Sequence, residues 1–411
     1  MTKHHDQLVK YASLAIQLGV NVQPGQTLVI FAPLVSVDFV RLLVKHAYEI
    51  GAKLVYVEWV DSEITRLKYE LAPFEALLEY PMWQAKGYEE LASQNAAFLY
   101  VSANNPDLMN GIDPKRLQTA SKTSSTAIKE LTMARLTNKV SWTIVAVPTP
   151  AWADKVFPLL PAEERVDALW SAIFQATRVE KDDPIEEWRN HARTLLTKSD
   201  LLNQKQYKAL HYCAEGTDIT VDLPQDHLWV SAGSNNQQGD TFIANMPTEE
   251  VFTSPLRTGV NGTVRSTKPL SYNGVLIENF SLTFEEGRII DFEAEKGEEM
   301  LRTLVEMDEG SHYLGEIALV PHRSPISDMN LIFYNTLYDE NASCHFAIGR
   351  AFPFCLKDGV TMSGEELLKR GLNESLTHVD FMMGSADMDI DGIKMNGEVE
   401  PVFRNGDWVI S

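Results

Sequence analysis

The feature that most constrains the fold is a change of hydrophobic pattern along the chain. Up to about residue 180, short apolar runs alternate with longer amphipathic segments, whereas from Asp218 onward short alternating runs are separated by glycine-containing turns. Strands joined through helices pair in parallel, and strands joined by tight turns pair antiparallel. The pattern therefore predicts an α/β N-terminal domain with a mainly parallel sheet, followed by a largely antiparallel β (α+β) C-terminal domain.

The first half carries four apolar runs that predict buried parallel strands. They cover residues 27–32, 54–60, 97–101 and 142–147, and helix-spaced apolar residues occupy 37–50 and 114–136. The first run is followed by Pro33-Leu34-Val35-Ser36, which lacks the glycine-rich turn that nucleotide-binding folds place between strand and helix. We therefore interpret this half as scaffold.

At 411 residues the chain exceeds what one hydrophobic core usually serves, so we expect two domains. A highly charged helical stretch from about residue 163 to 210 predicts the connection between them, which gives domains at residues 1–200 and 201–411. In the second domain, three pairs predict hairpin turns between β-prone runs: Asn261-Gly262, Asn273-Gly274 and Glu286-Gly287.

The formal net charge is −21, and no run rich in lysine and arginine interrupts it. Such a field repels phosphate backbones and anionic lipids, so we expect neither nucleic acid nor a membrane as partner. It would favour a cationic group such as the free amino terminus of a peptide, although acidic composition more often serves solubility. Three scattered cysteines, the lack of a signal peptide and the lack of a membrane-spanning run predict a cytoplasmic protein.

Four segments of the second half combine carboxylates or imidazoles with apolar neighbours: residues 245–252, 315–320, 335–345 and 378–382. In the last segment, residues two apart on a strand share a face, so His378 and Asp380 could bind one metal ion. An ordinary His–Asp hydrogen bond is the alternative. Glu316 begins an apolar strand and needs a cationic partner, either a metal or a neighbouring arginine or lysine.

The other two segments leave similar alternatives open. Glu249 and Glu250 project in different directions, so one could be a ligand and the other a general base, or both could face solvent. His345 ends a polar segment that leads into an apolar run. Carboxylates and imidazoles without a thiolate suit Zn²⁺, Mn²⁺ or Co²⁺, which can polarise a peptide carbonyl and activate water. No short metal motif such as H-E-x-x-H occurs, so spacing alone does not establish the site.

In these segments the chain resembles the M29 family of metallo-aminopeptidases, and the resemblance extends to residues 21–25, 139–143 and 266–270. It implies a C-terminal catalytic domain, peptides with a free N-terminus as substrates, and a homodimer that encloses its active sites. It also implies two divalent metal ions per chain, Zn, Co, Mn or Mg, with Glu316 as the bridge. The implied metal ligands are Glu250, Glu316, His345, His378 and Asp380, with Glu340 as a further ligand or a base.

Two points remain open within this resemblance. Glu249 and Glu340 are both candidates for moving the proton to the leaving amine. Family members often carry a tyrosine seven residues after the histidine that matches His345, and here that residue is Phe352, which has no hydroxyl to donate. The alternatives to an aminopeptidase are a two-metal phosphoesterase and a non-catalytic peptide-binding scaffold that retains the metal site.

Overall fold

The computed structural model describes residues 4–103 and 105–410. They form two compact units. The first comprises the described residues up to Ile112 together with Thr126–Arg193 and Ala232–Thr248, and the second comprises Asp113–Ser125, Thr194–Ser231 and the described residues from Glu249 onward. The domain boundary at residue 200 stays a prediction.

The first unit contains a four-stranded parallel sheet with the order β2-β1-β3-β4. Its strands are β1 (Thr27–Pro33), β2 (Leu54–Val60), β3 (Ala97–Ser102) and β4 (Trp142–Ala146), and a separate two-stranded sheet pairs β8 (Ser234–Asn235) with β9 (Thr241–Phe242). The helices are α1 (His5–Leu14), α2 (Val37–Glu49), α3 (Ser62–Leu71), α4 (Met82–Ser93), α6 (Lys129–Leu136), α7 (Pro150–Val156), α8 (Ala162–Ala176) and the first part of α9 (Pro184–Lys205). The predicted α/β class is confirmed.

Three details of this unit differ from the sequence prediction. Strand β2 is parallel as predicted but not buried, because it lies at the sheet edge and the following helix α3 buries none of its residues. The stretch 114–136 forms two helices, α5 (Pro114–Ala127) and α6, with the break between them at Ile128. The charged stretch after residue 163 is likewise two helices, and Pro184 begins the second.

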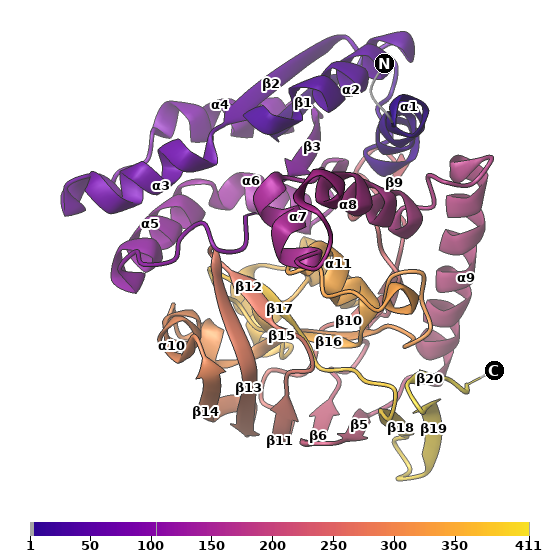
Figure 1. Ribbon diagram of the computed structural model, residues 1–411. Helices are drawn as coiled ribbons and strands as arrows, with labels where there is room; N and C mark the ends of the chain where they lie inside the picture. Colours follow the sequence, from indigo (N-terminus) through magenta and orange to yellow (C-terminus); the bar gives the residue numbers. More distant parts are fainter. Residues whose placement is uncertain (1–3, 104, 411) are drawn as a thin grey trace. The chain divides into compact units, whose positions relative to one another are not determined.

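The second unit contains a nine-stranded sheet and a five-stranded sheet (Figure 1). The larger has the order β12-β13-β11-β6-β5-β18-β19-β20, with β14 pairing to β13, and its pairs are antiparallel. Its strands are β5 (Ala209–Ala214), β6 (Thr217–Asp222), β11 (Val260–Arg265), β12 (Leu270–Tyr272), β13 (Val275–Glu285), β14 (Arg288–Lys296), β18 (Asp389–Ile393), β19 (Val399–Arg404) and β20 (Asp407–Trp408). The predicted antiparallel class is confirmed.

Two of the three predicted turns are confirmed. Asn273-Gly274 joins β12 to β13, and Glu286-Gly287 joins β13 to β14. The turn predicted at Asn261-Gly262 is wrong, because both residues lie inside β11. Gly262 has φ +121°, and a Cβ there would meet the carbonyl oxygen of Asp218 at 2.2 Å. The glycine permits close approach of two backbones instead of a turn.

The five-stranded sheet is antiparallel, with the order β17-β16-β15-β10-β7. Its strands are β7 (Val230–Ser231), β10 (Val251–Thr253), β15 (Leu314–Leu319), β16 (His345–Gly349) and β17 (His378–Met382). The helices of this unit are most of α5, the end of α9, α10 (Glu298–Val305), α11 (Thr336–Asp339) and α12 (Gly364–Lys369). In Figure 1, α10 lies beside the long β13–β14 hairpin.

One face of the five-stranded sheet packs against the nine-stranded sheet. Phe346 of β16 contacts Tyr212 of β5 at 5.0 Å between ring centroids, and Phe381 of β17 contacts Phe280 of β13 at 5.5 Å. All four rings are fully buried, and each contributes roughly 1.5–3 kcal/mol through burial. Because side chains alternate along a strand, the residues between these point to the opposite face.

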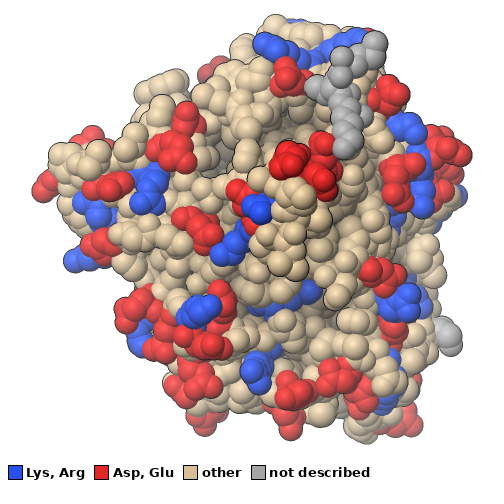
Figure 2. Space-filling model, viewed as in Figure 1, with Lys and Arg blue, Asp and Glu red and all other residues tan. Residues whose placement is uncertain are grey.

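Acidic side chains gather along the lower edge of the face shown in Figure 2, with basic side chains interspersed. On β14, Asp291, Glu293 and Glu295 are exposed. In the part of the chain that the structure describes, no helix has the length and apolar character needed to cross a membrane.

Candidate metal centre

The predicted site residues of three strands lie on one face of the five-stranded sheet. In the strand register, His345 lies opposite Ala318, and Ala347 lies opposite both Glu316 and Asp380. Residues directly opposite one another share a face, and so do residues two apart on one strand. The polar face therefore carries Glu316, His345, Asp380 and His378 together, although Glu316 and Asp380 are 64 residues apart in the sequence.

Small residues separate these side chains. Ala318, Ala347 and Gly349 occupy the intervening positions of β15 and β16 on the same face. Gly349 lies opposite His378 with φ +109°, and a Cβ there would meet the carbonyl oxygen of Thr377 at 2.3 Å. The face therefore has functional side chains with little bulk between them, which leaves space for ligands among them.

The carboxylate of Glu316 lies between two imidazoles. Its Oε2 is 3.1 Å from Nε2 of His378, and its Oε1 is 4.0 Å from Nε2 of His345. On one side, Glu250 Oε2 is 3.0 Å from the same nitrogen of His345. On the other side, Asp380 Oδ1 is 3.3 Å from Nε2 of His378. Glu316 thus has histidine partners, where an arginine or lysine was the ordinary alternative.

Two groups of side chains could each hold a metal ion. One consists of Glu250, Glu316 and His345, and the other of Glu316, His378 and Asp380, with the candidate ligand atoms of each group within 4.8 Å of one another. Glu316 belongs to both groups. This geometry corresponds to the ligand set that the resemblance implies, with one shared carboxylate.

Backbone carbonyls orient both imidazoles. Nδ1 of His345 donates to the carbonyl oxygen of Glu340 at 2.9 Å, and Nδ1 of His378 donates to that of Arg350 at 2.7 Å. A proton fixed on Nδ1 leaves Nε2 as the atom that faces the carboxylates. Histidines that bind metals are commonly held in this way through their second nitrogen.

Burial governs the titration of the carboxylates. It raises the pKa of Glu316 to about 7; the hydrogen bond from His378 opposes this shift, and the charges of Asp380 and Glu250 add to it. Burial and the same two charges also hold the pKa of Glu340 well above its usual value. Asp380 differs, because its interactions with His378 outweigh burial and lower its pKa.

The imidazoles shift in the opposite sense to what burial alone would produce. Burial lowers the pKa of His345, but the hydrogen bond with Glu250 and the surrounding carboxylates outweigh it and raise the pKa to about 10. The pKa of His378 is also raised well above its usual value, since Asp380 and Glu316 outweigh burial. Each ionised carboxylate raises the free energy of the other ionised carboxylates close to it. A positive charge among them therefore stabilises the cluster.

A divalent metal ion would supply this positive charge. It would favour ionised carboxylates and imidazoles with a free Nε2, and it would offset the desolvation of the buried acids. The donors are oxygen and imidazole nitrogen, the set preferred by Zn²⁺, Mn²⁺ and Co²⁺. The residues present therefore fit the metal that the sequence predicts.

The two candidate bases lie beside this cluster. Glu249 is buried, and its backbone N–H donates to Oδ1 of Asn341 at 2.7 Å. Nδ2 of Asn341 donates to Oε1 of Glu340 at 3.3 Å. Sequence reasoning missed Asn341, which links the two predicted bases. The only signal was its place in a polar segment, which also suits a helix cap.

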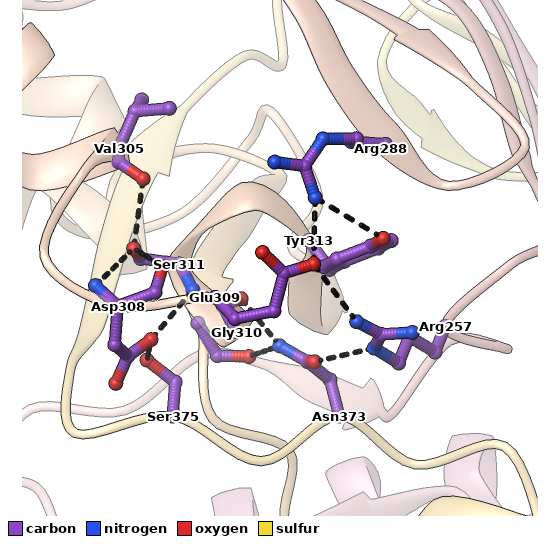
Figure 3. Close-up of polar contacts among 11 residues, drawn as sticks. Arg257, Arg288, Val305, Asp308, Glu309, Gly310, Ser311, Tyr313, Asn373 and Ser375 are labelled. Atoms are coloured by element: carbon purple, nitrogen blue, oxygen red, sulfur yellow. Dashed lines mark hydrogen bonds and ion pairs between the residues drawn. The ribbon is translucent and has the colours of Figure 1, made fainter.

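A network of polar contacts holds the segment that leads into β17 (Figure 3). Nδ2 of Asn373 donates to the carbonyl oxygen of Gly310 at 2.7 Å, and Ser375 Oγ donates to Asp308 Oδ1 at 2.8 Å. The same Asn373 nitrogen also donates to the carbonyl oxygen of Gly349 at 2.6 Å. Asn373 and Ser375 are buried. Because these contacts lie within five residues of His378, they fix the start of its strand.

Carboxylates and imidazoles gathered on one sheet face are the donor set used by metal-dependent hydrolases. The family model described as thermophilic metalloprotease (M29) matches residues 4–408. The chain therefore belongs to the M29 metalloprotease family, which confirms the resemblance seen in the sequence.

Characterised relatives match over nearly the whole chain. Aminopeptidase AmpS of Bacillus subtilis (strain 168) is 58% identical, with 99% of this chain and 100% of the relative covered. Aminopeptidase T of Thermus aquaticus is 44% identical, with 98% and 99% covered. The solved structure of wild-type AmpT from Thermus thermophilus is 43% identical, covers 99% of this chain and 100% of its own, and has a TM-score of 0.91. The predicted fold class is thereby confirmed.

Proposed function

We propose that this protein is a metal-dependent aminopeptidase that releases N-terminal residues from peptides. The observation that carries the proposal is the Glu316 carboxylate, whose two oxygens face two different histidines at the junction of two candidate metal-binding groups. Relatives named as aminopeptidases, at 44–58% identity over nearly full length, support the same activity. The phosphoesterase and scaffold alternatives lack comparable support.

In this proposal the site takes two divalent ions, with Glu316 as the bridge. Glu250 and His345 complete one ligand set, and His378 and Asp380 complete the other. Ions bound there would polarise the scissile carbonyl and lower the pKa of water. Zn, Co and Mn suit the mixed oxygen and nitrogen donors best, and Mg suits them less because it prefers oxygen.

The chain's own residues then handle protons and the substrate amine. Glu340 accepts a proton from the attacking water and transfers it to the leaving amine. Its burial beside the cluster, where Nδ2 of Asn341 donates to its Oε1 at 3.3 Å, supports this assignment, because a base must be held within reach of the reacting water. Its absence from both three-residue groups also favours a base over a ligand. The negative cluster attracts the substrate's cationic amino terminus.

The test compares two amides that differ only at the amine. Metal-loaded protein is expected to hydrolyse L-leucine p-nitroanilide and to leave its N-acetyl derivative intact, because acetylation removes the charged amine. Treatment with EDTA should abolish the activity, and elemental analysis should find two ions per chain. Equal hydrolysis of both amides, or full activity without metal, would contradict the proposal.

We also propose that the protein assembles as a homodimer. Strand β2 lies at the edge of its sheet, and Trp59 on this strand is 43% exposed. Further along the chain, Ile64 and Leu71 of α3 are 65% and 72% exposed, and Trp83 of α4 is 75% exposed. Exposed apolar groups of this density usually mark an interface. Light scattering should give a dimer for the wild type and a monomer for Leu71→Glu. A dimer that survives both Leu71→Glu and Ile64→Glu would exclude this surface.

A further inference from the structure

Three phenylalanines form an aromatic cluster at one end of the polar sheet face. The ring of Phe352 stacks on that of Phe354 at 5.0 Å, and Phe252 meets them edge-on at 5.6 and 6.1 Å. All three side chains are only partly buried, so their outer surfaces face solvent. Core aromatic residues of the same unit, such as Phe346 and Phe381, are fully buried.

This aromatic cluster is continuous with the candidate metal centre. The ring of Phe352 lies 4.7 Å from that of His378, between centroids. Phe252 follows Glu250 by two residues and lies opposite Ala318 on the polar face, in the same row as His345. Two separate segments therefore bring phenyl rings to the edge of the ligand set.

The backbone keeps the cluster in place. The N–H of Phe352 donates to Oγ of Ser254 at 3.0 Å, and Ser254 is fully buried two residues after Phe252. A short 3₁₀ helix, Pro353–Cys355, begins directly after Phe352 and contains Phe354. The rings are thus anchored to β10 on one side and to the end of β16 on the other.

The chemistry of the cluster limits what it can bind. All three residues are phenylalanines, so these rings carry no hydroxyl that could pair with a polar group. In an aminoacyl substrate, the first side chain branches from the carbon next to the scissile carbonyl. A carbonyl held at the metal centre therefore brings that side chain within a few bond lengths of the rings.

We infer that Phe252, Phe352 and Phe354 form the subsite for the N-terminal side chain of the substrate and select uncharged apolar residues such as leucine and phenylalanine. The inference rests on the proposed aminopeptidase function. Each apolar group buried there strengthens binding, whereas a charged side chain would lose hydration against rings that offer it no hydrogen bond.

The experiment measures kcat/KM for alanyl, leucyl, phenylalanyl, glutamyl and lysyl p-nitroanilides with matched metal content. The wild type should prefer leucyl over alanyl by on the order of tenfold, the effect expected of a few extra buried carbons. In Phe252→Ala and in Phe354→Ala this ratio should fall toward one. Phe292→Ala removes a partly buried ring from β14 on the other sheet and should keep the wild-type ratio.

A binding measurement separates recognition from turnover. By calorimetry, L-leucine should bind the metal-loaded wild type more tightly than L-alanine, and the two variants should lose that difference. If Phe252→Ala does not fold, Phe354→Ala decides the question. Hydrolysis with a wild-type ratio in the folded variants, or a preference for lysyl, would overturn the subsite alone. Failure to hydrolyse any of the five amides would overturn the proposed function together with it.

Discussion

Glu316 is the residue that the two candidate metal-binding groups share. It is buried, it faces both histidines, and it belongs to both groups that could hold a metal ion. A carboxylate in this position loses hydration on folding, which raises its pKa to about 7, and a cation bound between the two groups would offset that cost.

Glu316→Gln should therefore remove bound metal and lower kcat by roughly 100-fold or more, a loss at or above that seen when groups supporting metal ligands are removed. Glutamine has nearly the same shape, so the fold should persist. The measurements are metal content, circular dichroism and hydrolysis of L-leucine p-nitroanilide. Glu285→Gln, at an exposed position of β13, is the control. Two ions per chain and normal turnover in Glu316→Gln would exclude it as a ligand.

Phe352 permits the opposite kind of test, in which a function is added. Phe352→Tyr introduces a hydroxyl beside His378, and we expect a higher kcat if that hydroxyl donates a hydrogen bond to the developing oxyanion. The ratio of leucyl to alanyl hydrolysis should stay nearly the same, because the ring remains. An unchanged or lower kcat at equal metal content would show that the hydroxyl has no such role here.

At the scale of elements, strand β16 separates site from core by alternation. Ala347 points to the polar face between Glu316 and Asp380, while Ile348 next to it is fully buried on the other face. Ala347→Leu should fill the space between the carboxylates and abolish metal binding. Ile348→Ala should instead cost about 2–5 kcal/mol of stability and keep the metal.

Denaturant unfolding and metal analysis on both variants distinguish these effects. The prediction is that Ala347→Leu lowers the metal content, whereas Ile348→Ala lowers the free energy of unfolding. Retention of both ions in Ala347→Leu would mean that the space between Glu316 and Asp380 is not where metal binds. Loss of metal in both variants would mean that the two faces are not independent.

Periodicity predicted some elements well and others poorly, for physical reasons. The shared face of His378 and Asp380 followed from the two-residue repeat of a strand, and β17 confirms it. The exposure of β2 could not be predicted, because an apolar run reads the same at a sheet edge as at its centre. Gly262 was misread because an Asn-Gly pair suits both a tight turn and a close approach of strands.

The pairing of distant segments was also beyond the sequence pattern. The clusters containing Glu250, Glu316 and Asp380 were recognised individually, but the register that brings them together depends on β10, β15, β16 and β17 as a sheet. The family resemblance supplied that link. The small residues Ala318, Ala347 and Gly349, spaced two apart or on neighbouring strands, are the sequence feature that marks this shared face.

At the scale of the whole molecule, a carboxylate outside the candidate metal centre also makes the stability of the fold depend on pH. Glu400 of β19 accepts hydrogen bonds from Lys205, Tyr207 and Lys394, which lower its pKa to about 2. The Lys205 and Lys394 ammonium groups lie 2.8 and 2.9 Å from its oxygens. These contacts join the end of α9 to the edge of the nine-stranded sheet, within the second unit.

A carboxylate whose pKa is lower in the folded state stabilises the fold above its unfolded value of 4.5, and this contribution is lost as the pH falls toward 2. Glu400→Gln should therefore lower Tm at pH 7, and the difference from wild type should shrink between pH 4.5 and 2. Solvent and salt screen part of the effect. Glu285→Gln should show no such trend. A difference that is constant with pH would contradict the assignment.

The two-faced sheet has a consequence for mutational tolerance. Insertion of a single codon within β15 would rotate every later side chain of that strand to the opposite side. An insertion before Glu316 would turn this carboxylate into the apolar interior and would turn Ile317 toward the acidic residues. A single insertion would therefore disrupt both the hydrophobic core and the candidate metal centre. Insertions of this kind should be absent from functional variants of β15, even where conservative substitutions are accepted, whereas the exposed turn at Asn396-Gly397, between β18 and β19, should accept additional residues.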